Sequence, residues 1–154
     1  YTLSESYCMN DMTILLVEDN ADDELLALRA LRKTDVPNSV VVARDGEEAL
    51  DYIFARGKYK GRDVRALPKV VFLDLQLPKL NGLEVLRHIR QDERTRRLPV
   101  VLLTSSDETQ DMKAGYDIGV NSYINKPVDF DEFVSQVKLL GQYWLGVNRV
   151  PALY

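Results

Sequence analysis

The chain is poor in the residues that build disulfides and transition-metal sites. Its 154 residues include one cysteine, Cys8, and one histidine, His88. A single thiol cannot form a disulfide within the chain, and a single histidine excludes a histidine-rich metal site. Sparse cysteine fits a reducing compartment, so we expect a cytoplasmic protein.

Long apolar segments and a strong charge of either sign are also missing. No apolar run reaches the roughly 20 residues of a membrane-spanning helix, and residues 1–12 lack the apolar stretch of a signal peptide. The net charge is −4. The basic residues near 56–69 and 94–97 come without an aromatic platform or a recognition-helix pattern, which favours a solvated loop surface. We therefore expect neither a membrane nor a nucleic acid as partner.

The chain does contain a regular alternation of two patterns. Five apolar runs lack the every-second-residue alternation of half-exposed strands and so indicate strands buried on both faces: residues 13–17, 39–43, 70–73, 100–103 and 122–124. Helical patterns follow the runs: after Asn20, over 46–56, after Gly82, over 108–118 and from Asp129. Five such units predict an α/β fold, with a doubly wound parallel sheet and helices on both faces.

The first and fifth helices have predicted caps and faces. Asn20 is the expected N-cap of the first helix. Three acidic residues in its first turn should interact favourably with the positive end of the helix dipole: Asp22, Asp23 and Glu24. An apolar stripe is expected to pack inward: Leu25, Leu28 and Leu31. In the fifth helix the 3.6-residue period predicts a longer sheet-facing set: Phe130, Phe133, Val134, Val137, Leu140 and Trp144.

Polar side chains end four of the five strands. They are Glu18 and Asp19 after the first, Asp74 after the third, Thr104 after the fourth and Lys126 after the fifth. A doubly wound sheet gathers these ends at one edge. Carboxylates about 4–5 Å apart repel by several kcal/mol at an effective dielectric near 20, so a compensating cation is required. Lys126 supplies one charge and Mg²⁺ suits the remainder, a set typical of phosphoryl transfer onto an aspartate.

Four stretches together resemble the receiver domain of two-component response regulators. They are Glu18-Asp19, the segment LDLQLPKLNG at residues 73–82, Thr104-Ser105 and Lys126-Pro127. The likeness covers residues 12–141 and implies a flavodoxin-like sheet in the order 2-1-3-4-5. It also implies a signalling protein rather than an enzyme: Asp74 accepts a phosphoryl group from the phosphohistidine of a sensor histidine kinase and is later dephosphorylated by self-catalysed hydrolysis.

The resemblance assigns a role to each residue at the strand ends. It implies that Mg²⁺ is held by Glu18, Asp19, Asp74 and the backbone carbonyl of Gln76. Thr104 and Lys126 then contact the phosphoryl oxygens. The kinase is expected to dock over the first helix and the loop after Lys126.

Further positions follow from the same resemblance. Thr104 and Tyr123 form the expected switch, in which Tyr123 moves inward as Thr104 shifts toward the phosphoryl group. Gln76 and Ser106 occupy the positions that modulate the lifetime of the phosphoryl group. The Lys126-Pro127 bond is a candidate cis peptide.

The end of the chain predicts a contact between two copies. We divide the chain into an N-terminal extension (1–11), a receiver domain (12–141) and a C-terminal tail (142–154). Leu139 and Tyr143 fall on the side of the fifth helix away from the sheet, and more apolar residues follow. We expect the fourth helix, the fifth strand and the fifth helix to form a homodimer face, extended by the tail; the alternative is a tail folded onto its own domain. The ending and the loop before the third strand resemble stand-alone receivers paired with bacterial phytochrome kinases.

Two other functions are weighed against this interpretation. A phosphatase with an aspartyl nucleophile needs an acid two residues after that aspartate, where this chain has Gln76. A phosphorylation-independent pseudo-receiver, acting only as an interaction module, should have lost part of the acidic set, which this chain retains in full. A flavodoxin-like cofactor binder is disfavoured because the acidic turn at residues 18–21 repels phosphate and lacks glycine.

Overall fold

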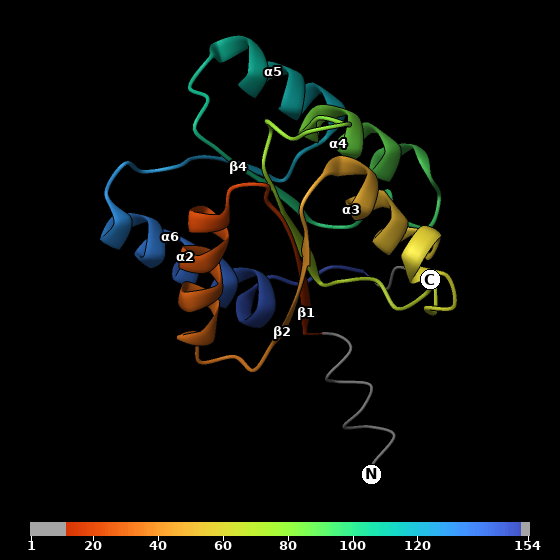
Figure 1. The fold of residues 1–154 in the computed structure, drawn as a ribbon, viewed down its shortest axis with the longest axis horizontal. Coiled ribbons are helices and arrows are strands. Elements are labelled where there is room, and N and C mark those ends of the chain that lie inside the picture. Colours follow the sequence, from red (N-terminus) through yellow and green to blue (C-terminus); the bar gives the residue numbers. More distant parts are fainter. Residues whose placement is uncertain (1–11, 152–154) are drawn as a thin grey trace.

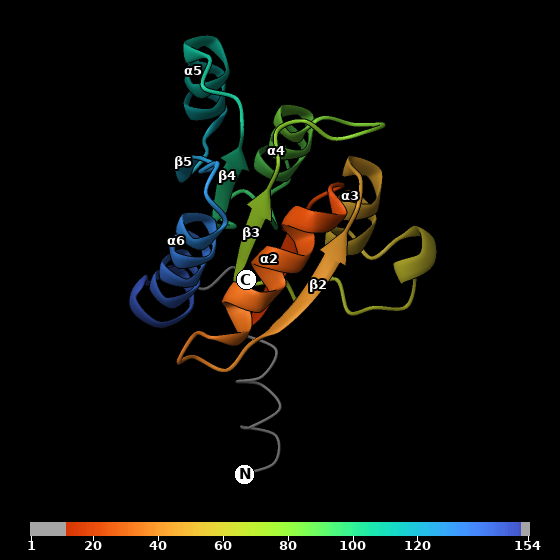
Figure 2. The same ribbon diagram turned by 60° about the vertical axis from the view of Figure 1, so that its left-hand side comes forward.

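The central sheet consists of five parallel strands. The computed structural model describes residues 12–151, and within them the strand order is β2-β1-β3-β4-β5 (Figure 2). The strands are β1 (Thr13–Val17), β2 (Ser39–Ala43), β3 (Val70–Leu73), β4 (Val100–Thr104) and β5 (Ser122–Asn125). Every neighbouring pair runs parallel. The predicted doubly wound, flavodoxin-like arrangement is confirmed.

Helices cover both faces of the sheet, as predicted. They are α2 (Ala21–Arg32), α3 (Gly46–Ile53), α4 (Gly82–Gln91), α5 (Thr109–Ile118) and α6 (Phe130–Gln142). Helices α2 and α6 lie on one face, and α3, α4 and α5 lie on the other (Figure 1). Two short turns complete the set: η1 (Gly57–Tyr59) and the π-helical turn η2 (Tyr143–Val147), which continues α6. In residues 12–151 no helix is both long and apolar enough to cross a bilayer.

Side-chain caps fix where the helices begin relative to the strands. Asn20 Oδ1 accepts the backbone N–H of Asp23 at 3.0 Å, which confirms the predicted cap of α2. Three further helices begin in the same way, at Asp45, Asn81 and Asp129. Because each cap binds a backbone N–H in the first turn, the loops that leave the carboxyl ends of the strands are held in place.

The helix predicted over residues 46–56 is shorter than expected. It ends at Ile53, and the next residues leave the helical conformation: Ala55 has φ 53° and Gly57 has φ 59°. A left-handed residue cannot continue a right-handed helix, so the chain turns into η1.

The predicted inward faces of α2 and α6 are partly wrong. Leu25 and Phe130 are exposed, whereas Leu31 is buried as predicted, together with Ala27 and Ala30. The two helices approach closely where a Cβ on Gly141 would lie only 2.8 Å from Leu31 Cδ2. The missing side chain at Gly141 therefore leaves the space that Leu31 fills between the two helices. Phe130 is the first residue of α6, ahead of its sheet-facing turns.

The segment before β3 is held together by the guanidinium group of Arg62, a role that the sequence analysis did not predict. Arg62 donates to the carbonyl oxygens of Tyr52, Ile53, Asp63 and Ala66 at 2.6–3.1 Å. Its guanidinium carbon lies 4.2 Å from the centroid of the Tyr52 ring. Arg62 thus ties the end of α3 to the loop that leads into β3. The interpretation of this basic segment as only a solvated surface is wrong for Arg62.

Replacement of Arg62 tests this tie. We expect Arg62→Ala to lower the free energy of unfolding by about 1–3 kcal/mol, because carbonyls of α3 lose their donors. Arg65→Ala is the matched control, since Arg65 forms only an exposed pair with Asp63, and it should change the free energy by less than about 0.5 kcal/mol. Urea unfolding followed by circular dichroism measures both. Equal values for the two variants would contradict the role of Arg62.

Candidate functional site

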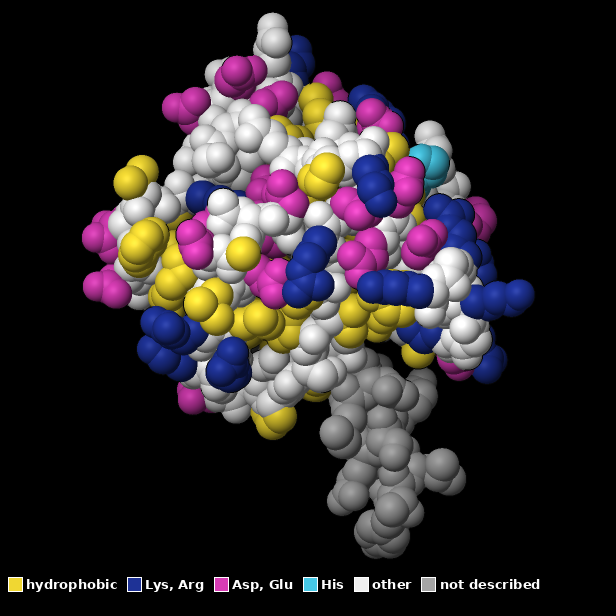
Figure 3. Space-filling model, viewed as in Figure 1, with side chains coloured by type: hydrophobic (Ala, Val, Ile, Leu, Met, Phe, Trp, Pro, Cys, Tyr) yellow, Lys and Arg dark blue, Asp and Glu magenta, His cyan; other side chains and the backbone are white. Residues whose placement is uncertain are grey.

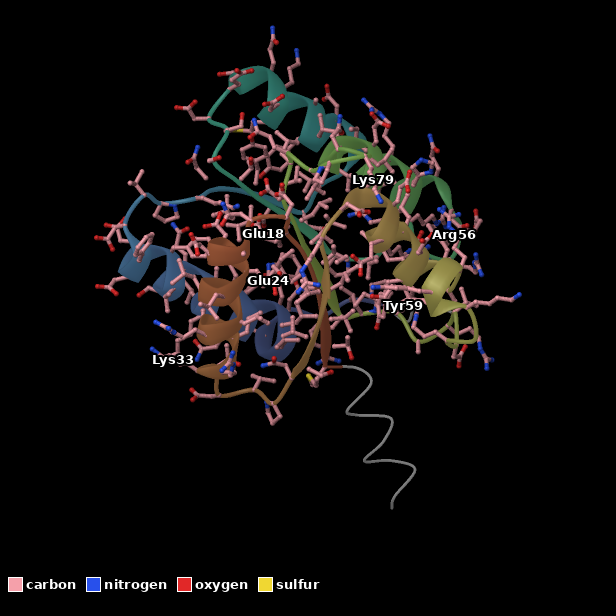
Figure 4. All side chains as sticks on the ribbon, in the orientation of Figure 1. Glu18, Glu24, Lys33, Arg56, Tyr59 and Lys79 are labelled. Carbon is pink, nitrogen blue, oxygen red and sulfur yellow. The ribbon has the colours of Figure 1, made fainter. Side chains whose placement is uncertain are left out.

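The site lies at the carboxyl edge of the sheet. Glu18 follows β1, beside the start of α2 (Figure 4). Asp74 follows β3, Thr104 ends β4, and Lys126 follows β5. The backbone N–H of Lys126 donates to Thr104 O at 2.7 Å, one residue beyond β5. This bond carries the lysine to the edge where the acidic residues meet.

The loop after β3 is folded tightly around Asp74. The N–H of Gly82 donates to Leu75 O at 2.8 Å. A Cβ on Gly82 would collide with the carbonyl oxygen of Asp74 and lie 2.8 Å from Leu75 Cα. Only glycine fits this approach, which explains the Asn81-Gly82 pair at the start of α4. The N–H of Gln76 donates to Asp74 Oδ1 at 3.2 Å and orients the carboxylate.

One ammonium group joins three carboxylates. Lys126 Nζ lies 2.7 Å from Glu18 Oε1, 2.9 Å from Asp23 Oδ2 and 2.9 Å from Asp74 Oδ2. Glu18 and Asp74 are the predicted neighbours of Lys126. Asp23 was predicted only to favour the helix dipole, and its place in the site was missed. No pattern within residues 18–24 predicts this contact, because Asp23 reaches Lys126 only once α2 has packed on the sheet.

Burial changes the proton affinities in this group. The side chains of Glu18, Lys126 and Asp74 are 4%, 9% and 10% exposed. Burial raises the pKa of Glu18 to about 7, against the opposing hydrogen bond from Lys126. Burial alone would lower the pKa of Lys126, but the bonds to Glu18 and Asp23 and the charge of Asp74 hold that pKa above its ordinary value. Lys126 is therefore a permanent cation.

The acidic residues have the composition of a divalent-cation site. Carboxylate oxygens of Glu18, Asp19 and Asp74 all lie within 4.8 Å of one another. With Asp23 there are four carboxylates against one ammonium. Hard oxygen donors and this charge imbalance fit Mg²⁺ or Mn²⁺. Asp19 is exposed, so the site opens to solvent. The backbone carbonyl of Gln76 stays a predicted ligand.

Hydrogen bonds link the loop after β4 to β5. Thr104 is fully buried, and its Oγ1 accepts the N–H of Ser106 at 3.2 Å. Tyr123 Oη and Asn125 Nδ2 both donate to Ser106 O, at 3.0 and 3.2 Å. Ser106 Oγ donates to Asp111 Oδ2 at 2.6 Å. The predicted switch residues Thr104 and Tyr123 thus meet through Ser106.

The Lys126-Pro127 bond is trans, because residues 12–151 contain no cis peptide. The prediction of a cis bond is wrong here. The trans isomer is intrinsically favoured by about 0.5–1 kcal/mol, and it already brings the Lys126 ammonium to the carboxylates.

A separate apolar surface lies along the end of the chain. Leu139 and Tyr143 are exposed as predicted, and so are Val147 and Val150. Trp144 is buried as predicted, and Leu145, an apolar residue of the tail, is buried beside it. The reason is that η2 continues the turn of α6 and directs both side chains into the core beneath α2 and α6. Residues 1–11, which include Cys8, and residues 152–154 of the predicted tail lie outside the described residues.

Comparisons with known proteins agree with this geometry. The model of the response regulator receiver domain matches residues 14–138. A probable methanogenesis regulatory protein, FilR2 of Methanothrix harundinacea, is 42% identical over 138 residues, which are 90% of this chain and 86% of FilR2. Response regulator Rcp1 of Synechocystis is 34% identical over 139 residues, 90% of this chain and 92% of Rcp1.

Solved structures show the same fold. The Mn²⁺-bound form of Rcp1 superposes with a TM-score of 0.85 at 33% identity, over 92% of this chain and 99% of that chain. The phosphorylated cyanobacterial phytochrome response regulator RcpA has the same TM-score and coverage at 38% identity. Because the family model spans most of the sequence and the acidic edge has the expected geometry, the chain belongs to the response regulator receiver domains and is similar to the phytochrome-associated regulators among them.

Proposed function

We propose that Asp74 accepts a phosphoryl group from the phosphohistidine of a sensor histidine kinase. The observation that carries this proposal is the environment of Asp74: one oxygen accepts the Gln76 N–H, and the other pairs with the Lys126 ammonium. The carboxylate is therefore held in a fixed direction at the edge of the site. The similarity to RcpA, which was solved in a phosphorylated form, supports the assignment.

The reaction is a displacement at phosphorus. An oxygen of Asp74 attacks, the bond between phosphorus and the donor's imidazole nitrogen breaks, and that nitrogen keeps the electron pair. Mg²⁺, held by Glu18, Asp19, Asp74 and the backbone carbonyl of Gln76, would offset the negative charge of the phosphoryl oxygens. Lys126 binds another of these oxygens. Thr104 donates its hydroxyl hydrogen, which has no acceptor among the residues described.

The switch follows from the contacts of the loop after β4. When Thr104 turns its hydroxyl toward the phosphoryl group, Ser106 must move, because its N–H is bound to that hydroxyl. The hydrogen bonds from Tyr123 and Asn125 to Ser106 O then break, or the two side chains move together with Ser106. Tyr123 is half-buried and is free to turn inward once its acceptor leaves. The charge of the phosphoryl group on Asp74 thereby changes the surface formed by α5 and β5.

Water returns the protein to its starting state by hydrolysing the acyl phosphate. Gln76 is exposed at the mouth of the site, and the Ser106 hydroxyl is held by Asp111. These two positions modulate access of water to the acyl phosphate. Gln76 cannot protonate a leaving group as an acid would, which disfavours a general phosphatase. The intact set of Asp74, Lys126 and Thr104 disfavours a phosphorylation-independent pseudo-receiver.

Exposed apolar residues beside the site suit a protein partner. Val128 is 97% exposed, and Phe130 and Leu25 are also exposed. Hydrophobic and acidic side chains adjoin over α2 and the start of α6 (Figure 3). We assign this surface to the sensor kinase, a phytochrome by analogy with RcpA. We place this exchange in the cytoplasm.

The second apolar surface suits another copy of the chain. Leu139 and Tyr143 lie on α6 and η2, and Val147 extends the patch. An exposed apolar patch of this kind marks a protein contact. We propose that it forms the homodimer face, together with α5, β5 and the tail.

Phosphorylation by a small donor tests the acceptor. With acetyl phosphate and Mg²⁺, the wild-type protein should gain one phosphoryl group by intact mass, and Asp74→Asn should gain none because an amide is not a nucleophile. Asp117→Asn, a change at an exposed residue of α5, should behave like the wild type. Equal uptake by Asp74→Asn would refute the assignment.

The raised pKa of Glu18, about 7, predicts how pH affects metal binding. Below this value Glu18 carries a proton that a divalent cation must displace. The affinity for Mg²⁺ should therefore increase about ten-fold from pH 6 to pH 8 and should change little above pH 8. Isothermal titration calorimetry measures this. Glu18→Gln cannot lose a proton and should bind more weakly, with little change over the same range. An equally steep increase in Glu18→Gln would show that another group is responsible.

Size-exclusion chromatography tests the dimer face. The wild-type protein should elute as a dimer, and Tyr143→Asp should elute as a monomer because a charge is placed within the apolar contact. Leu25→Asp makes the same type of change at an exposed residue of α2 and should leave the dimer intact. A monomeric wild-type protein at high concentration, or a dimeric Tyr143→Asp, would reject this face.

A further inference from the structure

We propose that Asp23 is a positioning residue that keeps the Lys126 ammonium at the site after a divalent cation binds. This inference rests on the proposed phosphoryl transfer to Asp74. An ammonium group has three hydrogens, and here each faces one carboxylate: that of Glu18, Asp23 or Asp74. Lys126 is thus fully occupied in the metal-free protein.

A divalent cation competes for two of these three carboxylates. Glu18 and Asp74 belong to the cluster of oxygens that fits the cation, whereas Asp23 does not. If a bound cation used the Glu18 and Asp74 oxygens that now face Lys126, the ammonium would lose two acceptors and would also face a like charge. Asp23 is then the remaining carboxylate in contact with the ammonium. The two freed N–H groups become available to the phosphoryl oxygens.

Asp23 is held rigidly enough for this task. Its backbone N–H is bound by the cap residue Asn20 at 3.0 Å. Helix α2 is fixed on the sheet by Ala27, Ala30 and Leu31. A lysine side chain has four rotatable carbon–carbon bonds and therefore many accessible rotamers. A fixed carboxylate therefore limits the directions that the ammonium can take when the other two acceptors are gone.

Loss of the Asp23 carboxylate should not unfold the protein. The Asp23 side chain is 31% exposed, compared with 4% for Glu18 and 10% for Asp74. In its absence, Lys126 keeps two carboxylate partners in the metal-free state, so no buried charge is left unpaired. The effect should appear in the reaction rather than in stability.

The test compares phosphoryl uptake from acetyl phosphate at saturating Mg²⁺. Asp23→Ala should lower the maximal rate about three- to ten-fold, because the ammonium is less well placed to bind the transferring group. Asp23→Asn should recover part of the rate, since its amide oxygen can accept the same N–H. Asp22→Ala is the matched control: it removes the same charge from the same helical turn at an exposed residue and should leave the rate unchanged.

A double-mutant comparison separates positioning from a general effect of charge. In a Lys126→Ala background, Asp23→Ala should cause no further loss, because Asp23 acts through Lys126. The inference is overturned if Asp23→Ala matches Asp22→Ala, or if its effect persists undiminished without Lys126. Absence of phosphoryl uptake by the wild-type protein is a different result: it would overturn the proposed function itself.

Discussion

Four carboxylates share one edge of the sheet with one ammonium group, and the rest of the site depends on that contact. Two unit charges 4 Å apart interact by about 4 kcal/mol at an effective dielectric of 20. Glu18, Asp23 and Asp74 are tolerated together because each pairs with Lys126. Burial also makes Glu18 easier to protonate, because it raises the pKa of this carboxyl to about 7, and the protonated form adds no negative charge to the site. In the metal-free protein the single ammonium of Lys126 therefore leaves an excess of negative charge, which a divalent cation would offset.

The fold supplies this arrangement by simple means. Parallel strands place the ends of β1, β3, β4 and β5 at one edge, and side-chain caps fix where α2 and α4 begin. Gly82 allows the loop after β3 to close over the backbone of Asp74. On the other side of the site, Ser106 joins Thr104 to Tyr123. Thr104, Ser106 and Tyr123 are thus linked by consecutive hydrogen bonds, and we propose that a change at Asp74 reaches α5 and β5 along them once Thr104 contacts the phosphoryl group.

Sequence reasoning predicted the sheet and the strand-end residues because both depend on strong local signals. Continuous apolar runs indicate buried strands, and polar residues that end such runs must meet at one edge. It failed where a tertiary contact decided the outcome. Asp23 joins the site only because α2 places it beside Lys126. Arg62 binds carbonyls of α3, and Leu25 is exposed while Ala27 and Ala30 are buried. None of these pairings has a signature in one segment alone.

A crystal structure of the protein saturated with Mg²⁺ tests the central claim most directly. The account predicts an ion in contact with Glu18, Asp19 and Asp74, and Lys126 Nζ moved out of hydrogen-bond distance of Glu18 and Asp74. An ion bound elsewhere, or an unchanged three-way contact of Lys126 with no ion beside it, would contradict the account.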